Sequence, residues 1–145
     1  MFNVKVTLTS LPGFIDNDYL LKYVRLIERN RNTRNRKGTN KHHIIPKSWF
    51  KLNNQVINNN LENLVTLSYR DHVLAHYFLC LCTEEQLQFA NQLALMCLVS
   101  RDKLNYVDKA LIRGLPLYNN IYESYKERRQ TNYKLYDDVL IDKEE

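Results

Sequence analysis

Three short runs of sequence decide the fold: His42-His43-Ile44-Ile45-Pro46, then Asn63-Leu64-Val65-Thr66-Leu67, then Asp71-His72-Val73-Leu74-Ala75-His76. In the first run, Pro46 disfavours helical backbone at the residue before it, so a short extended segment is expected there. The second run is rich in residues that favour β-strands. Ser68 then offers an N-cap, with Asp71 three residues later, and a helix is expected from Tyr69 to about Leu81. The order is therefore strand, loop, strand, helix.

These runs contain all four histidines of the chain. His72 and His76 are four residues apart, which places both imidazoles on one face of the expected helix, as in other helical metal-binding motifs. His42 and His43 are adjacent on an extended segment and must point to opposite sides. One of these two rings can therefore join the helical pair around a metal. The other is left nearby as a general base for water, and three protein ligands with positions left for water are typical of a catalytic metal site.

The same runs resemble the HNH endonuclease family, and more narrowly the small HNH nucleases of phages and mobile elements. Those proteins often carry His-His-Ile-Ile-Pro and a closing Glu- or Asp-His-x-x-Ala-His. The resemblance covers about Lys41 to Leu79. It implies a ββα-metal finger, in which two short strands and one helix surround a single metal ion.

The resemblance also implies a role for each site residue. His43 matches the general base that activates water for attack on the scissile phosphate, and Asn63 matches the asparagine that ties the loop and helps orient the base. The metal ligands would be His42, His72 and His76. Three imidazoles favour Zn²⁺ or another transition metal over Mg²⁺ or Mn²⁺, which remain alternatives. Relatives commonly have a glycine-rich turn after the proline, whereas this chain has Trp49 to Leu52 and an asparagine-rich stretch, which leaves Asn60 as an alternative to Asn63.

Charge is distributed unevenly along the chain. Between Lys22 and Lys51 there are ten basic residues and one acidic residue, although the net charge of the whole chain is only +5. A basic segment beside a candidate site suits double-stranded DNA, because phosphate contacts need positive charge and reach; a solvated helix face is the alternative. The candidate DNA-binding residues are Arg31, Arg34, Arg36, Lys37, Lys41, Lys47 and Arg70.

Outside the central runs, the pattern predicts further elements. Phe2, Val4, Val6 and Leu8 alternate with polar residues, which favours a short N-terminal strand. The apolar spacing predicts a helix that buries Leu20, Tyr23, Val24 and Ile27, followed by a basic loop over Asn30 to Asn40, and a long loop is expected from Lys51 to Asn63 with Val56 and Ile57 as packing points. C-terminal helices are expected to open at the capping box Thr83-Glu84-Glu85-Gln86, near Tyr106 to Ile112, and from Tyr118 to Arg129.

The fold class expected from these elements is α+β and mostly helical. A ββα-metal HNH core would carry an N-terminal strand and helix and several C-terminal helices. The 145 residues fit one compact domain, which divides into an N-terminal part with a basic arm (1–40), the HNH core (41–82) and a helical region with an acidic tail (83–145).

The expected location is the cytoplasm. The resemblance to phage and mobile-element nucleases implies the cytoplasm of a bacterial host cell. The N-terminus does not resemble a signal peptide, and no run is apolar enough to span a bilayer. Cys80, Cys82 and Cys97 lie in apolar segments, which indicates reduced core thiols.

The expected activity is hydrolysis of a phosphodiester bond in DNA. With one site per chain, a monomer would nick and only a homodimer would cut both strands. Two alternatives stay open. The chain can be a non-catalytic binding protein on an HNH scaffold, such as an inhibitor of a host-defence nuclease of the CRISPR type, or a regulator built around a structural zinc site.

Overall fold

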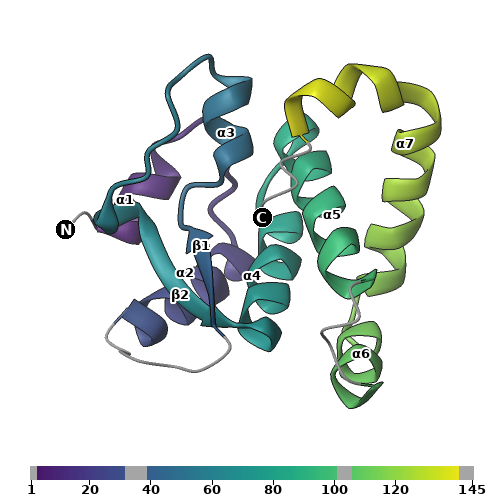
Figure 1. Ribbon diagram of the computed structural model, residues 1–145, viewed down its shortest axis with the longest axis horizontal. Helices are drawn as coiled ribbons and strands as arrows, with labels where there is room; N and C mark the ends of the chain where they lie inside the picture. Colours follow the sequence, from purple (N-terminus) through teal and green to yellow (C-terminus); the bar gives the residue numbers. More distant parts are fainter. Residues whose placement is uncertain (1–2, 32–38, 101–105, 141–145) are drawn as a thin grey trace.

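Helix α4 (Tyr69–Cys82) is the centre of the computed structural model, which describes residues 3–31, 39–100 and 106–140. Figure 1 shows α4 between two groups of elements, one with the small sheet and the N-terminal helices, the other with the C-terminal helices. The first group contains α1 (Val4–Thr9), α2 (Asp18–Arg31), β1 (Thr39–His43), α3 (Lys47–Leu52), the 3₁₀ helix η1 (Leu61–Asn63) and β2 (Leu64–Ser68). The second contains α5 (Glu85–Ser100), α6 (Tyr106–Arg113) and α7 (Tyr118–Leu140).

The two strands pair in antiparallel register and form the sheet of the described part of the chain. His42 is paired with Val65, and His43 with Leu64. Side chains alternate between the faces of a strand, so His42 and Val65 are buried against the helices, whereas Lys41 and Thr66 are exposed on the other face. The predicted order of strand, strand and helix is confirmed, as is a mostly helical α+β fold. The predicted position of the first strand is wrong, because the strand covers Thr39–His43, at the end of the expected basic loop, and stops before Ile44 and Ile45.

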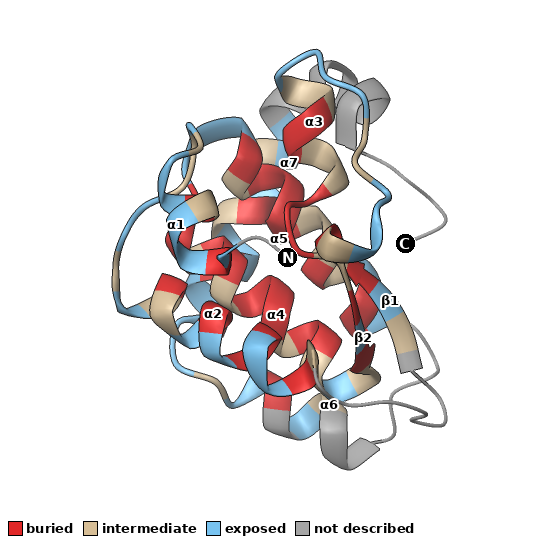
Figure 2. Cartoon of the chain, turned by 90° about the vertical axis from the view of Figure 1, so that its left-hand side faces the viewer, coloured by how far each residue is buried: buried red, intermediate tan, exposed pale blue. Residues whose placement is uncertain are grey.

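Helix α4 is buried on both sides. Its N-terminus is capped as predicted, because the Ser68 hydroxyl oxygen accepts from the amide of Asp71 at 3.1 Å. Ala75 and Leu79 pack into the cluster of the N-terminal group. Val73 and Tyr77 pack into the cluster with α5, α6 and α7. Figure 2 shows the resulting series of buried residues along α4. Contacts on both sides fix this helix, and with it the two histidines that it carries.

The predicted N-terminal strand is wrong, because residues Val4–Thr9 form helix α1. The Asn3 side chain caps this helix by accepting from the amide of Val6 at 3.0 Å. Val4 and Leu8, four residues apart, are both fully buried, while Val6 between them is 65% exposed. An apolar pair with this spacing satisfies either a strand or a helix, and here the cap and the packing against α2 decide in favour of the helix.

The predicted loop from Lys51 to Asn63 is also partly wrong. Helix α3 covers Lys47–Leu52, and η1 occupies the end of the segment. Trp49 and Phe50 bury their rings in the N-terminal cluster, and the Trp49 indole N–H donates to the carbonyl of Pro12 at 3.0 Å. Of the two expected packing points, Ile57 packs against this cluster, whereas Val56 is 92% exposed.

The C-terminal helices follow the prediction with shifted boundaries. Helix α5 begins at Glu85, two residues after the expected cap at Thr83, whose hydroxyl instead donates to the carbonyl of Leu79 at the end of α4. Helix α7 continues past Arg129 to Leu140. Residues 141–145, the end of the expected acidic tail, lie outside the described residues.

The sequence also predicts buried cysteine thiols and no segment that spans a membrane. Cys80 and Cys82 are buried thiols, as predicted, but Cys97 is exposed. Among the helices that the structure describes, none combines the length and apolar character that a bilayer-spanning segment needs.

Candidate metal centre and active site

Three histidines converge between β1 and α4. His42 comes from the strand, and His72 and His76 come from successive turns of the helix; all three are buried. One nitrogen of each ring lies within 4.8 Å of the others, and the ring centroids are 5.0 to 5.2 Å apart. The convergence predicted from the spacing of these residues is therefore confirmed, and the group is close enough to hold one metal ion.

His42 is held from its far side by helix α2. Its Nε2 atom lies 2.8 Å from the hydroxyl oxygen of Tyr23, and the same hydroxyl donates to the carbonyl of Ile44 at 2.8 Å. Tyr23 is fully buried. The ring of His42 is therefore fixed in orientation by a residue outside the sheet and α4.

The pKa of His42 lies well below the ordinary value of 6.5. Burial is the main cause, because it disfavours the charged ring, and the neighbouring charges of His76, His72 and His43 lower it further. The ring is therefore neutral at pH 7, and neutral imidazole is the form that binds metals.

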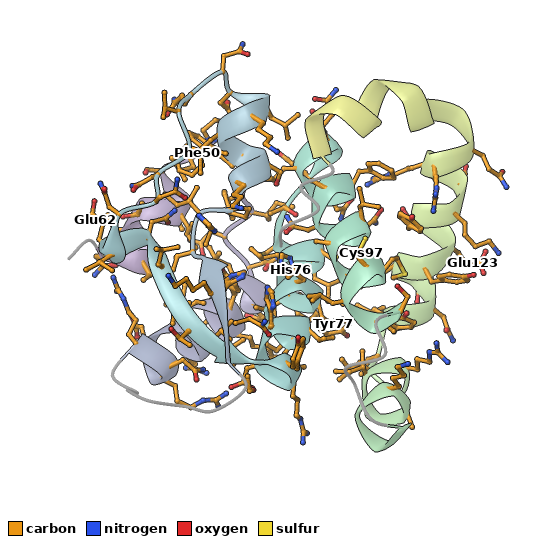
Figure 3. The ribbon with its side chains drawn as sticks, in the orientation of Figure 1. Phe50, Glu62, His76, Tyr77, Cys97 and Glu123 are labelled. Carbon is orange, nitrogen blue, oxygen red and sulfur yellow. The ribbon has the colours of Figure 1, made fainter. Side chains whose placement is uncertain are left out.

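His76 is held from the opposite side by helix α5. Figure 3 labels His76 on α4, together with the next residue, Tyr77. The Nδ1 atom of His76 lies 3.3 Å from the side-chain oxygen of Asn91, and the amide nitrogen of Asn91 donates to the carbonyl of Leu87 at 3.0 Å. Asn91 is 1% exposed. Elements on both sides of α4 thus contact the histidine cluster.

The donor set fits a transition-metal ion. In the described ranges, this group consists of three imidazoles without a carboxylate or a thiol. Imidazole nitrogen suits Zn²⁺ and neighbouring transition metals, while Mg²⁺ prefers oxygen ligands. Three protein ligands leave positions for water or substrate, which is typical of catalytic rather than structural sites.

His43 lies on the other face of β1, as the alternation of the strand predicts. It is half-buried, and its Nε2 atom lies 2.8 Å from the side-chain oxygen of Asn59, an exposed residue of the loop between α3 and η1. An amide oxygen only accepts hydrogen bonds, so Nε2 carries the proton in this contact. Its other nitrogen, Nδ1, then has the lone pair that a base needs.

Asn63 ties this loop to the end of β1. It is fully buried, and its side-chain oxygen accepts from the amide of Ile45 at 2.8 Å. Its amide nitrogen donates to the carbonyls of Ile45 and Asn58 at 3.3 and 2.9 Å. Asn60 is exposed. Asn63 therefore occupies the loop-tying position, while the contact to His43 comes from Asn59.

The candidate DNA-binding residues are spread over several elements. Lys41 is exposed and lies on the same face of β1 as His43, two residues away. Arg70 is exposed in the first turn of α4, and Lys47 is half-buried at the start of α3. Arg31 donates to the carbonyl of Glu62 at 3.3 Å. Arg34, Arg36 and Lys37 lie outside the described residues.

Tyr23, Asn59 and Asn91 were not recognised as site residues from the sequence. Tyr23 fits the apolar stripe of its helix and is indistinguishable from a packing residue. Asn59 is one of several asparagines in one stretch. Asn91 has a weak signal, since it lies four residues after Leu87 on an otherwise apolar face, where a buried polar residue needs a partner.

Comparisons with protein-family models, with curated proteins and with solved structures give no significant match to this chain.

Proposed function

We propose that this chain is a metal-dependent endonuclease that hydrolyses phosphodiester bonds in double-stranded DNA, by the chemistry that its resemblance to HNH nucleases implies. The observation that carries the proposal is the different environment of two adjacent histidines. His42 is buried with His72 and His76, whereas His43 on the other face is half-buried and hydrogen-bonded to the loop. A nuclease of this kind needs both a set of metal ligands and a separate base.

In the proposed reaction, His42, His72 and His76 hold the metal, which when bound stabilises negative charge on the scissile phosphate and on the leaving oxygen. Nδ1 of His43 accepts a proton from a water molecule as the water oxygen forms a bond to phosphorus. The bond from phosphorus to the 3′ oxygen breaks, and that oxygen takes a proton from solvent. The products are a 5′-phosphate and a 3′-hydroxyl. The hydrogen bond from Nε2 of His43 to Asn59 keeps Nδ1 as the basic atom.

The exposed face of the sheet is where DNA would approach. It presents His43 together with the exposed Lys41 and Thr66. Arg70 adds a positive charge at the start of α4. Phosphate groups are attracted by such charges without regard to base sequence, so this surface is suited to DNA in general rather than to one target.

A plasmid cleavage assay tests the proposal. The protein is supplied in turn with Zn²⁺, Mn²⁺, Ni²⁺ and Mg²⁺, and nicking of supercoiled DNA is measured for the wild type, for His43→Ala and for Asn120→Ala. Asn120→Ala is the control, because Asn120 is exposed on α7, away from the sheet. Loss of the base should slow cleavage by about 10²- to 10⁴-fold, while the control cuts at the wild-type rate.

Intact plasmid with every metal, from folded protein that binds the metal, would contradict the proposal. An equal rate for wild type and His43→Ala would contradict the role of His43. Intact plasmid with every metal would favour a protein-binding role for the same scaffold.

A further inference from the structure

We propose that Tyr23 and Asn91 are positioning residues, which determine the nitrogen that His42 and His76 present to the metal. Both belong to helices that lie outside the segment 41–82. The inference rests on the metal-binding part of the proposed function, but it does not depend on DNA cleavage. It assigns a role to α2 and α5, which otherwise only cover α4.

The proton count at Tyr23 determines the tautomer of His42. A tyrosine hydroxyl has one proton, and Tyr23 donates it to the carbonyl of Ile44. The contact at 2.8 Å between this hydroxyl and Nε2 of His42 therefore requires a proton on Nε2. A neutral ring has one such proton, so the lone pair is on Nδ1, and Nδ1 of His42 is the metal-binding atom.

The amide of Asn91 determines the tautomer of His76 by the same reasoning. Its nitrogen donates to the carbonyl of Leu87, which fixes the orientation of the amide. Its oxygen, which can only accept, then faces Nδ1 of His76 at 3.3 Å. Nδ1 must carry the proton, and Nε2 of His76 is the metal-binding atom.

These two contacts have consequences for affinity. Metal-binding histidines usually donate their other N–H to an outer partner, and loss of that partner typically weakens metal binding by 10- to 100-fold. Tyr23 and Asn91 are both buried, so no solvent water replaces either one without rearrangement. We therefore expect the variants Tyr23→Phe and Asn91→Leu each to weaken Zn²⁺ binding by about 10- to 100-fold.

The first experiment measures Zn²⁺ affinity by competition with a chromophoric chelator. Each variant has a matched control in a buried polar residue that contacts other groups. For Tyr23→Phe the control is Tyr77→Phe, because the Tyr77 hydroxyl donates to the carbonyl of Pro116. For Asn91→Leu it is Gln92→Leu, because Gln92 bonds to Ser124 and Arg128. The controls should keep wild-type affinity even where their melting temperature falls.

The second experiment separates positioning from simple structural support. The variant Asn91→Asp keeps an oxygen for Nδ1 of His76, so it should bind Zn²⁺ within about threefold of the wild type or more tightly. In metal-free wild type, nitrogen NMR should show the proton of His42 on Nε2 and that of His76 on Nδ1. The spectrum requires no metal and no activity, and it remains informative if one variant fails to fold.

Three results would overturn the inference: the opposite tautomers, wild-type affinity in both Tyr23→Phe and Asn91→Leu, or an Asn91→Asp variant as weak as Asn91→Leu. A wild-type protein that binds none of Zn²⁺, Co²⁺, Ni²⁺ or Mn²⁺ would contradict the metal-binding part of the proposed function. If that protein nevertheless showed the stated tautomers, Tyr23 and Asn91 would still be positioning residues for the two rings, although no metal binds there.

Discussion

The two faces of strand β1 differ in burial and in contacts, although each carries one of two adjacent histidines. On one face His42 is 3% exposed and lies among His72, His76 and Tyr23, with every ring contact supplied by a helix. On the other face His43 is half-buried, and the partner identified for it, Asn59, belongs to an exposed loop. The first face holds nitrogen donors in fixed positions and buried from solvent, whereas the second face is accessible to solvent.

This difference matches the needs of two kinds of chemistry. Metal ligands need neutral rings and fixed directions, and burial supplies both by lowering the pKa of His42 and restricting its movement. A general base needs access to water and to substrate. A strand can satisfy both needs with neighbouring residues, because successive side chains point to opposite faces.

The largest effect is expected from the buried face. The variant His72→Ala removes one of three ligands, so its Zn²⁺ affinity should fall by more than about 100-fold, the upper range for losing only an outer partner. The measurement is calorimetric titration with Zn²⁺. His43→Ala, on the exposed face, is the control and should titrate like the wild type. Equal affinity of all three proteins would remove the distinction between the faces.

Next comes the residue that holds the exposed face in place. In Asn63→Ala, the buried amide of Ile45 loses its partner, which should cost about 1–3 kcal/mol of unfolding free energy. The exposed Asn60 provides the control, and Asn60→Ala should change stability by less than about 0.5 kcal/mol. Both values come from urea unfolding. A larger loss in Asn60→Ala would reverse the assignment of the loop tie.

The pH dependence of the unfolding free energy of the metal-free protein is a second test of the buried face. Well above pH 6.5, His42 is neutral in both the folded and the unfolded chain. As the pH falls below 6.5, the unfolded chain binds a proton there that the folded chain resists, so stability decreases by at most about 1.4 kcal/mol per pH unit for one proton. His72, His76 and Tyr23 face this ring.

Urea unfolding with chelator present, between pH 8 and pH 5, measures this dependence. His42→Leu should flatten the curve between pH 7 and pH 5.5. A His42→Leu curve as steep as that of the wild type would show that another group is responsible.

A smaller effect is expected at Asn59, because it only orients the proposed base. Asn59→Ala should slow plasmid cleavage by about tenfold, which is less than the roughly 10²- to 10⁴-fold expected for loss of the base itself. Its unfolding free energy and its Zn²⁺ affinity should stay unchanged, because Asn59 is exposed and lies away from the buried histidines. An unchanged cleavage rate would mean that His43 is oriented by other contacts.

The spacing of the histidines was enough to predict the cluster of His42, His72 and His76, because a strand and a helix fix the direction of side chains locally. The N-terminal strand could not be distinguished from a helix, since Val4 and Leu8 fit both periodicities and only the Asn3 cap and the contact with α2 decide between them. Tyr23 and Asn91 depend on how α2 and α5 pack against α4. No local pattern carries that information, so the outer contacts of the site required the fold.

The most direct test of the division between the two faces is a side-by-side comparison of His42→Ala and His43→Ala. Zn²⁺ titration and plasmid cleavage are measured on the same preparations, after a thermal melt has shown that both variants are folded. The account predicts that His42→Ala loses both metal binding and cleavage, while His43→Ala binds Zn²⁺ like the wild type and does not cut. Loss of metal binding in His43→Ala, or full cleavage by it, would contradict the account.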